Sequence, residues 1–231
     1  YAAIEPHTPF TPHPDYNGKS KAGAYGDFVV QFDDGVGHIL QTLEDQDLAD
    51  NTIVILTSDN GGISTSHGLL QKHNIDYNPN DPLRGNKGDF LEGGVRIPFI
   101  VRWPGKVVPD TVSNEVICHS DLLRTFAAIL DVTIPETAAE DSSNVLPAFR
   151  GETLSERPLV LQSRAGHHAL RLGEWIYLDG KTNGDYRGEP IVETSGQLYR
   201  FPNDLHQDKN LYDSFPYKVA EMQKKLGKLK R

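Results

Sequence analysis

The spacing of hydrophobic residues along the chain predicts alternating helices and strands. Between Tyr25 and Asp45, apolar residues recur every three or four positions, which is typical of an amphipathic helix. Unbroken apolar runs at Ile53–Leu56 and Ile97–Val101 are typical of strands covered on both faces. A second amphipathic helix follows Ser120, which we predict to be its N-cap. This part of the chain therefore predicts an α/β fold, with a mostly parallel sheet packed between helices.

A different pattern follows Pro135 and the polar stretch at 136–143. Short apolar runs separated by Gly-rich and Asn-rich turns predict strands, and the end of the chain predicts a helix. These elements are Leu159–Gln162, Ala169–Leu172, Trp175–Leu178, Gln197–Arg200 and the helix Tyr217–Lys230. Several strands followed by a helix indicate a small antiparallel sheet capped by that helix. We therefore predict a division into an α/β part at residues 1–150 and a C-terminal subdomain at residues 151–231.

Composition limits the class of protein. A chain of 231 residues with 37% hydrophobic content can bury a substantial core. The net charge of -9 argues against a nucleic-acid partner, because phosphate contacts need a basic surface. No apolar run approaches the roughly 18 to 20 residues that span a bilayer. Cys118 is the single cysteine, so we expect no intrachain disulfide and interpret Cys118 as a small residue in or near the core.

Two oxygen-bearing side chains follow the strand at Ile53–Leu56. Asp59 and Asn60 come directly before Gly61 and Gly62. Ligands of open α/β sheets collect beyond the carboxyl ends of strands, and carboxylate and amide oxygens there can bind a divalent cation. The same four residues are also typical of a simple turn, and this alternative remains open.

A lysine among glycines precedes the second strand. Lys87 lies in the sequence Gly85–Gly88, and this sequence directly follows Arg84. A compact positive charge held in such a loop can bind a tetrahedral anion. The alternative is a solvated surface lysine.

These motifs, in this order and spacing, resemble the C-terminal half of the arylsulfatases, which are formylglycine-dependent sulfatases of alkaline-phosphatase-like fold. The resemblance covers nearly the whole chain. It rests on Pro6–Pro9, Ser58–Gly61, Gly85–Gly88, Glu92–Pro98, Trp103–Gly105, Asp121–Leu123 and Leu198–Tyr199.

The resemblance implies a role for each matching residue. Asp59 and Asn60 match ligands of a calcium ion, and Lys87 matches a contact to the substrate sulfate. His7 matches a histidine that contacts the sulfate and helps to protonate the leaving oxygen. These roles suit the side chains, because histidine titrates near neutrality while a lysine and a metal ion offset charge on the sulfuryl oxygens. The family also suggests an extracytoplasmic location, either periplasmic or secreted.

The nucleophile of this family has no counterpart in the sequence. It is a formylglycine made from the cysteine or serine of a Cys/Ser-x-Pro-x-Arg motif in the N-terminal half, and the present sequence lacks that motif. The family's paired N-terminal aspartates are also missing, because Asp33 and Asp34 lie within the predicted helix and are expected to face solvent. We therefore expect the N-terminal half of the same sulfatase as a partner. The separate chain should have little or no activity.

The long polar loop between the two apolar strands carries two further candidates. His67 and Arg84 are predicted substrate contacts, with ordinary polar loop residues as the alternative.

The sequence as a whole predicts hydrolysis of a sulfate ester, with either an aryl or a carbohydrate sulfate as substrate. One alternative is a non-catalytic module that binds sulfated glycans. Another is a phosphate or phosphonate ester hydrolase of the same fold. The sequence contains no Gly-x-Ser-x-Gly, His-Glu-x-x-His or Gly-x-Gly-x-x-Gly motif, which removes other common hydrolases and nucleotide-binding proteins.

Overall fold

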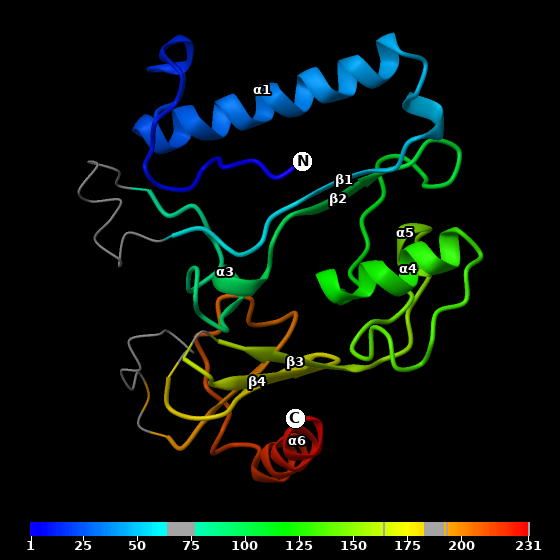
Figure 1. The fold of residues 1–231 in the computed structure, drawn as a ribbon. Helices are drawn as coiled ribbons and strands as arrows, with labels where there is room; N and C mark the ends of the chain where they lie inside the picture. Colours follow the sequence, from blue (N-terminus) through cyan, green and yellow to red (C-terminus); the bar gives the residue numbers. More distant parts are fainter. Residues whose placement is uncertain (64–76, 164, 183–191, 193, 231) are drawn as a thin grey trace. The chain divides into compact units, whose positions relative to one another are not determined.

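The computed structural model describes residues 1–63, 77–163, 165–182, 192 and 194–230 (Figure 1). The chain forms two compact units. Unit 1 contains Tyr1–Gln46, Thr57–Pro98 and Pro158–Arg231, and unit 2 contains Asp47–Leu56 and Phe99–Arg157. The predicted division after residue 150 stays a prediction, although the C-terminal sheet does begin close to it, at Pro158.

Unit 1 begins with a loop, the short 3-10 helix η1 (Pro14–Tyr16) and the long helix α1 (Gly23–Asp45). The predicted amphipathic helix is therefore confirmed. The loop before α1 is tied to the helix by the buried Asp27, whose carboxylate accepts hydrogen bonds from the backbone N–H groups of Gly18 (2.9 Å) and Ser20 (2.7 Å). Asp33 and Asp34 are exposed on the helix, as predicted.

The C-terminal part of unit 1 is a four-stranded antiparallel sheet in the order β3-β4-β5-β6. The strands are β3 (Pro158–Gln162), β4 (His168–Leu172), β5 (Trp175–Leu178) and β6 (Gln197–Arg200), and the helix α6 (Pro216–Leu229) follows them. This confirms the predicted C-terminal sheet and terminal helix (Figure 1).

Both faces of this sheet are covered, because alternate residues of a strand point to opposite sides. On one face, Leu170, Tyr177 and Leu198 pack against apolar side chains of α6, such as Met222. On the other face, Ala169, Ile176, Leu178 and Tyr199 pack against Phe90 and Leu91, which directly precede the short helix α3 (Glu92–Val95). The sheet therefore fixes the segment that follows Lys87.

Unit 2 is built around a separate apolar cluster. The strands β1 (Val54–Thr57) and β2 (Phe99–Arg102) form a two-stranded sheet. The last residue of β1, Thr57, is assigned to unit 1. The other elements are η2 (Ala49–Asn51), η4 (His119–Asp121), α4 (Leu122–Ile129) and α5 (Leu146–Phe149). Val145, Leu146 and Phe149 form the buried centre, against which Phe99 and Val101 of β2 pack. The predicted strands at Ile53 and Ile97 are thus confirmed, each shifted slightly along the chain.

The start of the α4 region differs from the prediction. Ser120 is not the N-cap, because Cys118 takes that position before η4. The backbone N–H of Cys118 donates to the carboxylate of Asp121 (2.8 Å), and Ser120 Oγ lies 2.8 Å from Cys118 Sγ. A fully buried carboxylate, rather than an exposed hydroxyl, therefore organises this helix start. Cys118 itself is half-buried, as expected for a residue near the core.

Among the described residues, no helix is both long enough and apolar enough to cross a membrane.

We expect Asp121→Ala to destabilise unit 2 strongly. Asp121 is fully buried, pairs with Arg157, and also accepts the backbone N–H of Ser143 (2.9 Å). Its removal leaves a largely buried guanidinium without its counter-charge, which costs about 3–5 kcal/mol of unfolding free energy. Urea denaturation measures this loss. Glu156→Ala, at an exposed carboxylate beside Arg157, is the control, and equal losses in the two variants would contradict the structural role of Asp121.

Candidate functional site

Two stretches of backbone meet directly where β1 ends. The N–H of Gly61 donates to the carbonyl of Gly94 (2.9 Å). A Cβ atom on Gly61 would lie 1.8 Å from the carbonyl oxygen of Gly93, and one on Gly93 would lie 2.4 Å from that of Gly85. No side chain fits at either contact, so glycine is required for the two stretches to touch.

Asn80 joins the same two stretches through its side chain. Its Oδ1 accepts from the N–H of Gly62 (2.8 Å), and its Nδ2 donates to the carbonyls of Gly62 (2.9 Å) and Gly85 (3.0 Å). The backbone N–H of Lys87 also donates to the carbonyl of Gly62 (3.0 Å). The segment that follows Asn60 and the loop that carries Lys87 are therefore brought together. We call residues 84–92 the lysine loop.

Asp59 and Asn60 offer hard oxygen ligands at this place. Asp59 is exposed, and Asn60 is half-buried. Asn60 Nδ2 donates to the carbonyl of Gly61 (2.9 Å), so its Oδ1 is the side-chain atom left for a ligand. A carboxylate beside an amide oxygen fits part of a calcium site, since calcium takes roughly six to eight oxygen ligands. Within the described ranges, no group of three or more His, Cys, Asp or Glu side chains is arranged to hold a metal ion.

The backbone around Lys87 is fixed by hydrogen bonds of its loop. Both the backbone N–H and Nδ2 of the buried Asn86 donate to the carboxylate of Asp89, at 3.0 and 2.9 Å. Lys87 lies within this turn, between Asn86 and Asp89, and is half-buried. In the part of the chain that the structure describes, no acidic side chain forms an ion pair with Lys87. A positive charge without an acidic partner among the described residues is suited to bind an external anion.

His7 lies in a separate turn at the start of unit 1. Its backbone N–H donates to the carbonyl of Ile4 (2.9 Å), and the imidazole is exposed. Nδ1 lies 2.8 Å from the carbonyl oxygen of Thr8. Because a carbonyl oxygen only accepts, Nδ1 is the donor, and Nε2 is the atom that can exchange a proton with a ligand.

Of the two remaining candidates, the structure describes Arg84 but not His67. Arg84 Nη2 donates to the hydroxyl of Tyr199 (3.1 Å) in strand β6, and its Nε is buried without a partner among the described residues. The guanidinium of Arg84 is therefore directed toward the C-terminal sheet. His67 lies outside the described residues, and its role as a substrate contact stays a prediction.

Sequence patterns did not reveal several residues that fix the lysine loop. Asn80 and Gln207 bind backbone groups of the loop, and Tyr199 binds Arg84. Asn80 lies in a polar turn and Gln207 in a loop, without any periodic pattern. The one available signal was Leu198–Tyr199, which contributed to the family resemblance without suggesting a role.

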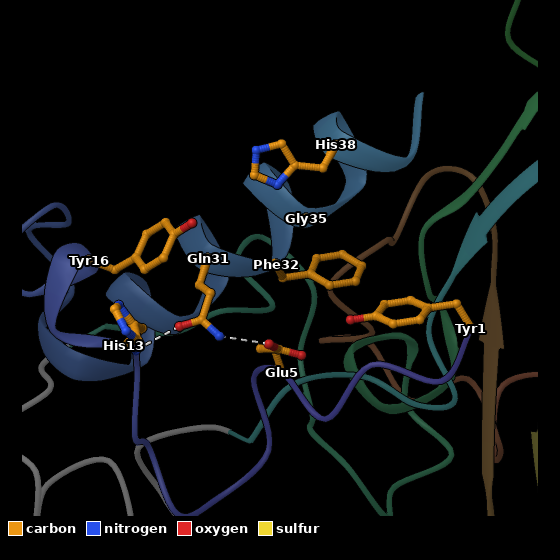
Figure 2. A pocket seen from close by; sticks show the side chains of 8 residues that line it. All are labelled: Tyr1, Glu5, His13, Tyr16, Gln31, Phe32, Gly35 and His38. Atoms are coloured by element: carbon orange, nitrogen blue, oxygen red, sulfur yellow. Dashed lines mark hydrogen bonds between the residues drawn. The ribbon is translucent and has the colours of Figure 1, made fainter. Parts of the chain in front are cut away.

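A cavity of about 330 Å³ lies elsewhere in unit 1, between the N-terminal loop and α1 (Figure 2). The side chain of Gln31 bridges its wall by donating to Glu5 (2.9 Å) and accepting from the backbone N–H of His13 (2.7 Å). None of the predicted site residues lines this cavity.

Comparisons with known proteins agree with the resemblance seen in the sequence. The model of the family described as Sulfatase matches residues 1–132. An N-acetylgalactosamine-6-O-sulfatase of Bacteroides thetaiotaomicron is 33% identical over 97% of this chain. A steryl-sulfatase of Rattus norvegicus is 36% identical over 63% of the chain.

The fold matches as well. A solved structure connected with the metabolism of multiple glycosaminoglycans by Bacteroides thetaiotaomicron superimposes with a TM-score of 0.84 over 98% of this chain, at 32% identity. The match confirms the predicted sulfatase fold, which is alkaline-phosphatase-like. The chain spans less than half of each of these relatives: 45% of the first sulfatase, 25% of the steryl-sulfatase and 48% of the solved structure.

We expect Gly61→Ala and Gly37→Ala to change stability in opposite directions. An alanine at Gly61 would force apart the backbone contact with Gly93 and cost at least about 3 kcal/mol. An alanine at Gly37, in α1 with open space around it, should stabilise by about 0.5–1 kcal/mol through helix propensity. Thermal unfolding followed by circular dichroism measures both. Unchanged stability of Gly61→Ala would show that the two stretches do not depend on their close contact.

Proposed function

This chain belongs to the sulfatase family, and we propose that it is the C-terminal portion of an enzyme that hydrolyses sulfate esters. One observation carries the proposal beyond family membership. The hydrogen bond from the backbone N–H of Lys87 to the carbonyl of Gly62 joins the loop of this lysine, which forms no ion pair with any described residue, to the segment that follows Asp59 and Asn60. An anion-binding group next to a pair of hard metal ligands suits a sulfate ester bound against a cation.

Lys87, Asp59 and Asn60 would act on the sulfuryl group of the ester. Lys87 would bind a sulfuryl oxygen and offset the negative charge that grows there during S–O bond cleavage. Asp59 and Asn60 would be ligands of a calcium ion, which when bound polarises the sulfuryl oxygens. The family's formylglycine would come from the part of the enzyme outside this chain, since the Cys/Ser-x-Pro-x-Arg motif is not in the sequence.

His7 would complete the reaction at the leaving group. As the bond between sulfur and the bridging oxygen breaks, that oxygen gains negative charge and needs a proton. With Nδ1 engaged by the carbonyl of Thr8, the imidazolium would deliver the proton from Nε2. The neutral ring that remains can accept a proton again at Nε2.

We propose a carbohydrate sulfate as the substrate class. The relative that matches over nearly the whole chain is named for N-acetylgalactosamine 6-O-sulfate chemistry, whereas the steryl-sulfatase matches over a shorter part. The C-terminal sheet, which lies beyond the residues that the family model matches, is included in the first match and in the superimposed structure. This shared sheet supports the carbohydrate class.

The proposal includes the N-terminal half of the same sulfatase as partner. Helix α1 exposes apolar side chains that a completed α/β layer would cover, with exposed fractions of 39% at Val29, 36% at Val30 and 40% at Ile39. The middle of β1 is only half-buried, although its sequence is that of an interior strand. The exposed apolar side chains of α1 and the half-buried strand β1 are evidence for the proposal that the rest of the enzyme adds a further layer that covers them.

A non-catalytic module for sulfated glycans is the second candidate. Its support is that Lys87 forms no ion pair with any described residue, while the sequence lacks the motif for the nucleophile.

Lys87→Ala in the intact protein should lower kcat/KM for an aryl sulfate and for a 6-sulfated N-acetylgalactosamine by about 10²–10³-fold, because a charged transition-state contact is lost. Lys106→Ala is the matched control, since Lys106 is an exposed lysine in unit 2, and it should leave kcat/KM unchanged. Faster turnover of the corresponding phosphate ester would instead favour a phosphatase. Saturable binding without turnover would favour the accessory module.

Asp59→Asn in the intact protein should weaken calcium binding by at least about 10-fold, because a hard anionic ligand is replaced by a neutral one. Isothermal titration calorimetry measures the affinity. Asp50→Asn, at an exposed aspartate of η2, should bind calcium as the wild type does. Equal affinity of both variants would remove Asp59 from the metal site.

A further inference from the structure

We propose that Tyr199 of the C-terminal sheet is a positioning residue that sets the place of Lys87 by holding the lysine loop through Arg84. The inference rests on the proposed function, in which Lys87 binds the sulfate. It assigns to the C-terminal sheet a part in catalysis, although none of its residues is proposed to touch the substrate.

The hydroxyl of Tyr199 is the centre of a directed chain of hydrogen bonds. It accepts from Arg84 Nη2 (3.1 Å) and donates to Gln197 Oε1 (2.7 Å). Gln197 Nε2 in turn donates to the carbonyl of Thr182 (2.9 Å). Arginine only donates and a carbonyl only accepts, so the direction of every bond is fixed. Tyr199 and Gln197 are 1% and 0% exposed, so water cannot replace a lost partner easily.

Arg84 transmits this constraint to the backbone of the lysine loop. Its carbonyl accepts the N–H of Gly93 (2.8 Å), which closes the loop between its first residue and the helix α3. The guanidinium also lies over the ring of Tyr199, with 5.7 Å from Cζ to the ring centroid. The start of the loop is thus held by β6.

The end of the loop is held by the same sheet. The backbone N–H of Glu92 donates to Gln207 Oε1 (2.7 Å), and the Glu92 carboxylate lies 3.7 Å from Arg171 of β4. Phe90 and Leu91 pack into the same apolar cluster as Tyr199. Lys87 lies between two fixed ends, so the register of the loop against the sheet determines where the ammonium group lies.

Tyrosine is suited to this place because its hydroxyl stays neutral. Burial raises the pKa of Tyr199 above its ordinary value, although Arg84 opposes that rise. The hydroxyl therefore remains a donor to Gln197 and an acceptor for Arg84 across the pH range in which proteins operate. Phenylalanine would fill the same space and remove both bonds.

The test uses Tyr199→Phe in the intact protein, with Tyr177→Phe as a matched control. Tyr177 lies in the neighbouring strand β5, is equally buried, and its hydroxyl also bonds two side chains, Asp179 (2.9 Å) and Gln223 (3.0 Å). It faces α6 rather than the lysine loop. Both variants therefore lose a tyrosine hydroxyl from the same sheet, but only one loses a contact to the loop.

Tyr199→Phe should lower kcat/KM for the sulfate ester by about 10-fold or more, since a small misplacement of a binding group is costly. Tyr177→Phe should change it by less than about twofold. Because Tyr199 acts through Lys87, adding Tyr199→Phe to Lys87→Ala should cause no further loss in kcat/KM. Amide hydrogen exchange at residues 85–91 should be faster in Tyr199→Phe and unchanged in Tyr177→Phe.

Two results would overturn the inference. One is an equal effect of the two tyrosine variants on kcat/KM and on exchange of the loop. The other is a full additional loss when Tyr199→Phe is combined with Lys87→Ala, since Tyr199 would then act elsewhere. If the wild-type protein hydrolyses no sulfate ester, the proposed function fails, and hydrogen exchange alone decides whether Tyr199 holds the loop.

Discussion

The candidate site depends on a contact between two stretches of backbone that have no side chains where they meet. Gly61 lies against Gly93, and Gly93 lies against Gly85, at distances that exclude even a methyl group. This contact lets the N–H of Lys87 reach the carbonyl of Gly62, so that the loop carrying Lys87 lies against the segment that follows Asp59 and Asn60. Backbone hydrogen bonds and Asn80 then keep that arrangement without using the groups that face a ligand.

The two faces of the C-terminal sheet have different roles. One packs against the terminal helix, and the other packs against the lysine loop. One face packs on α6 through Leu170, Tyr177 and Leu198. The other supports Phe90 and Leu91, and therefore the lysine loop. A strand alternates its side chains between faces, so neighbouring residues such as Leu198 and Tyr199 serve different purposes. The subdomain is thus a structural support for the loop that contains Lys87, the proposed anion-binding residue.

Local patterns predicted the elements well, and they predicted β5 and β6 with the bounds that the structure shows. Short apolar runs between glycine-rich turns leave little freedom in where a strand begins and ends. The prediction of Ser120 as the N-cap was wrong. The group that organises this helix start, Asp121, is stabilised by Arg157 and Ser143 from distant parts of the chain. Lys87, Asp59 and Asn60 were proposed as site residues from their chemistry and the family resemblance, and that assignment stays a prediction. Asn80, Tyr199 and Gln207 left no local signal, because each has a partner far along the chain.

Two of the side-chain hydrogen bonds between the lysine loop and the described C-terminal part of unit 1 join residues 115 positions apart, Arg84 to Tyr199 and Glu92 to Gln207. Contacts between residues so far apart in the sequence form late in folding, because the entropy cost of closing a long loop comes before the stabilising contact is made. During synthesis the lysine leaves the ribosome well before the residues that hold its loop. The proposed anion-binding geometry is therefore acquired only when β6 and the loop after it have folded, which makes the order of folding a condition for a finished site.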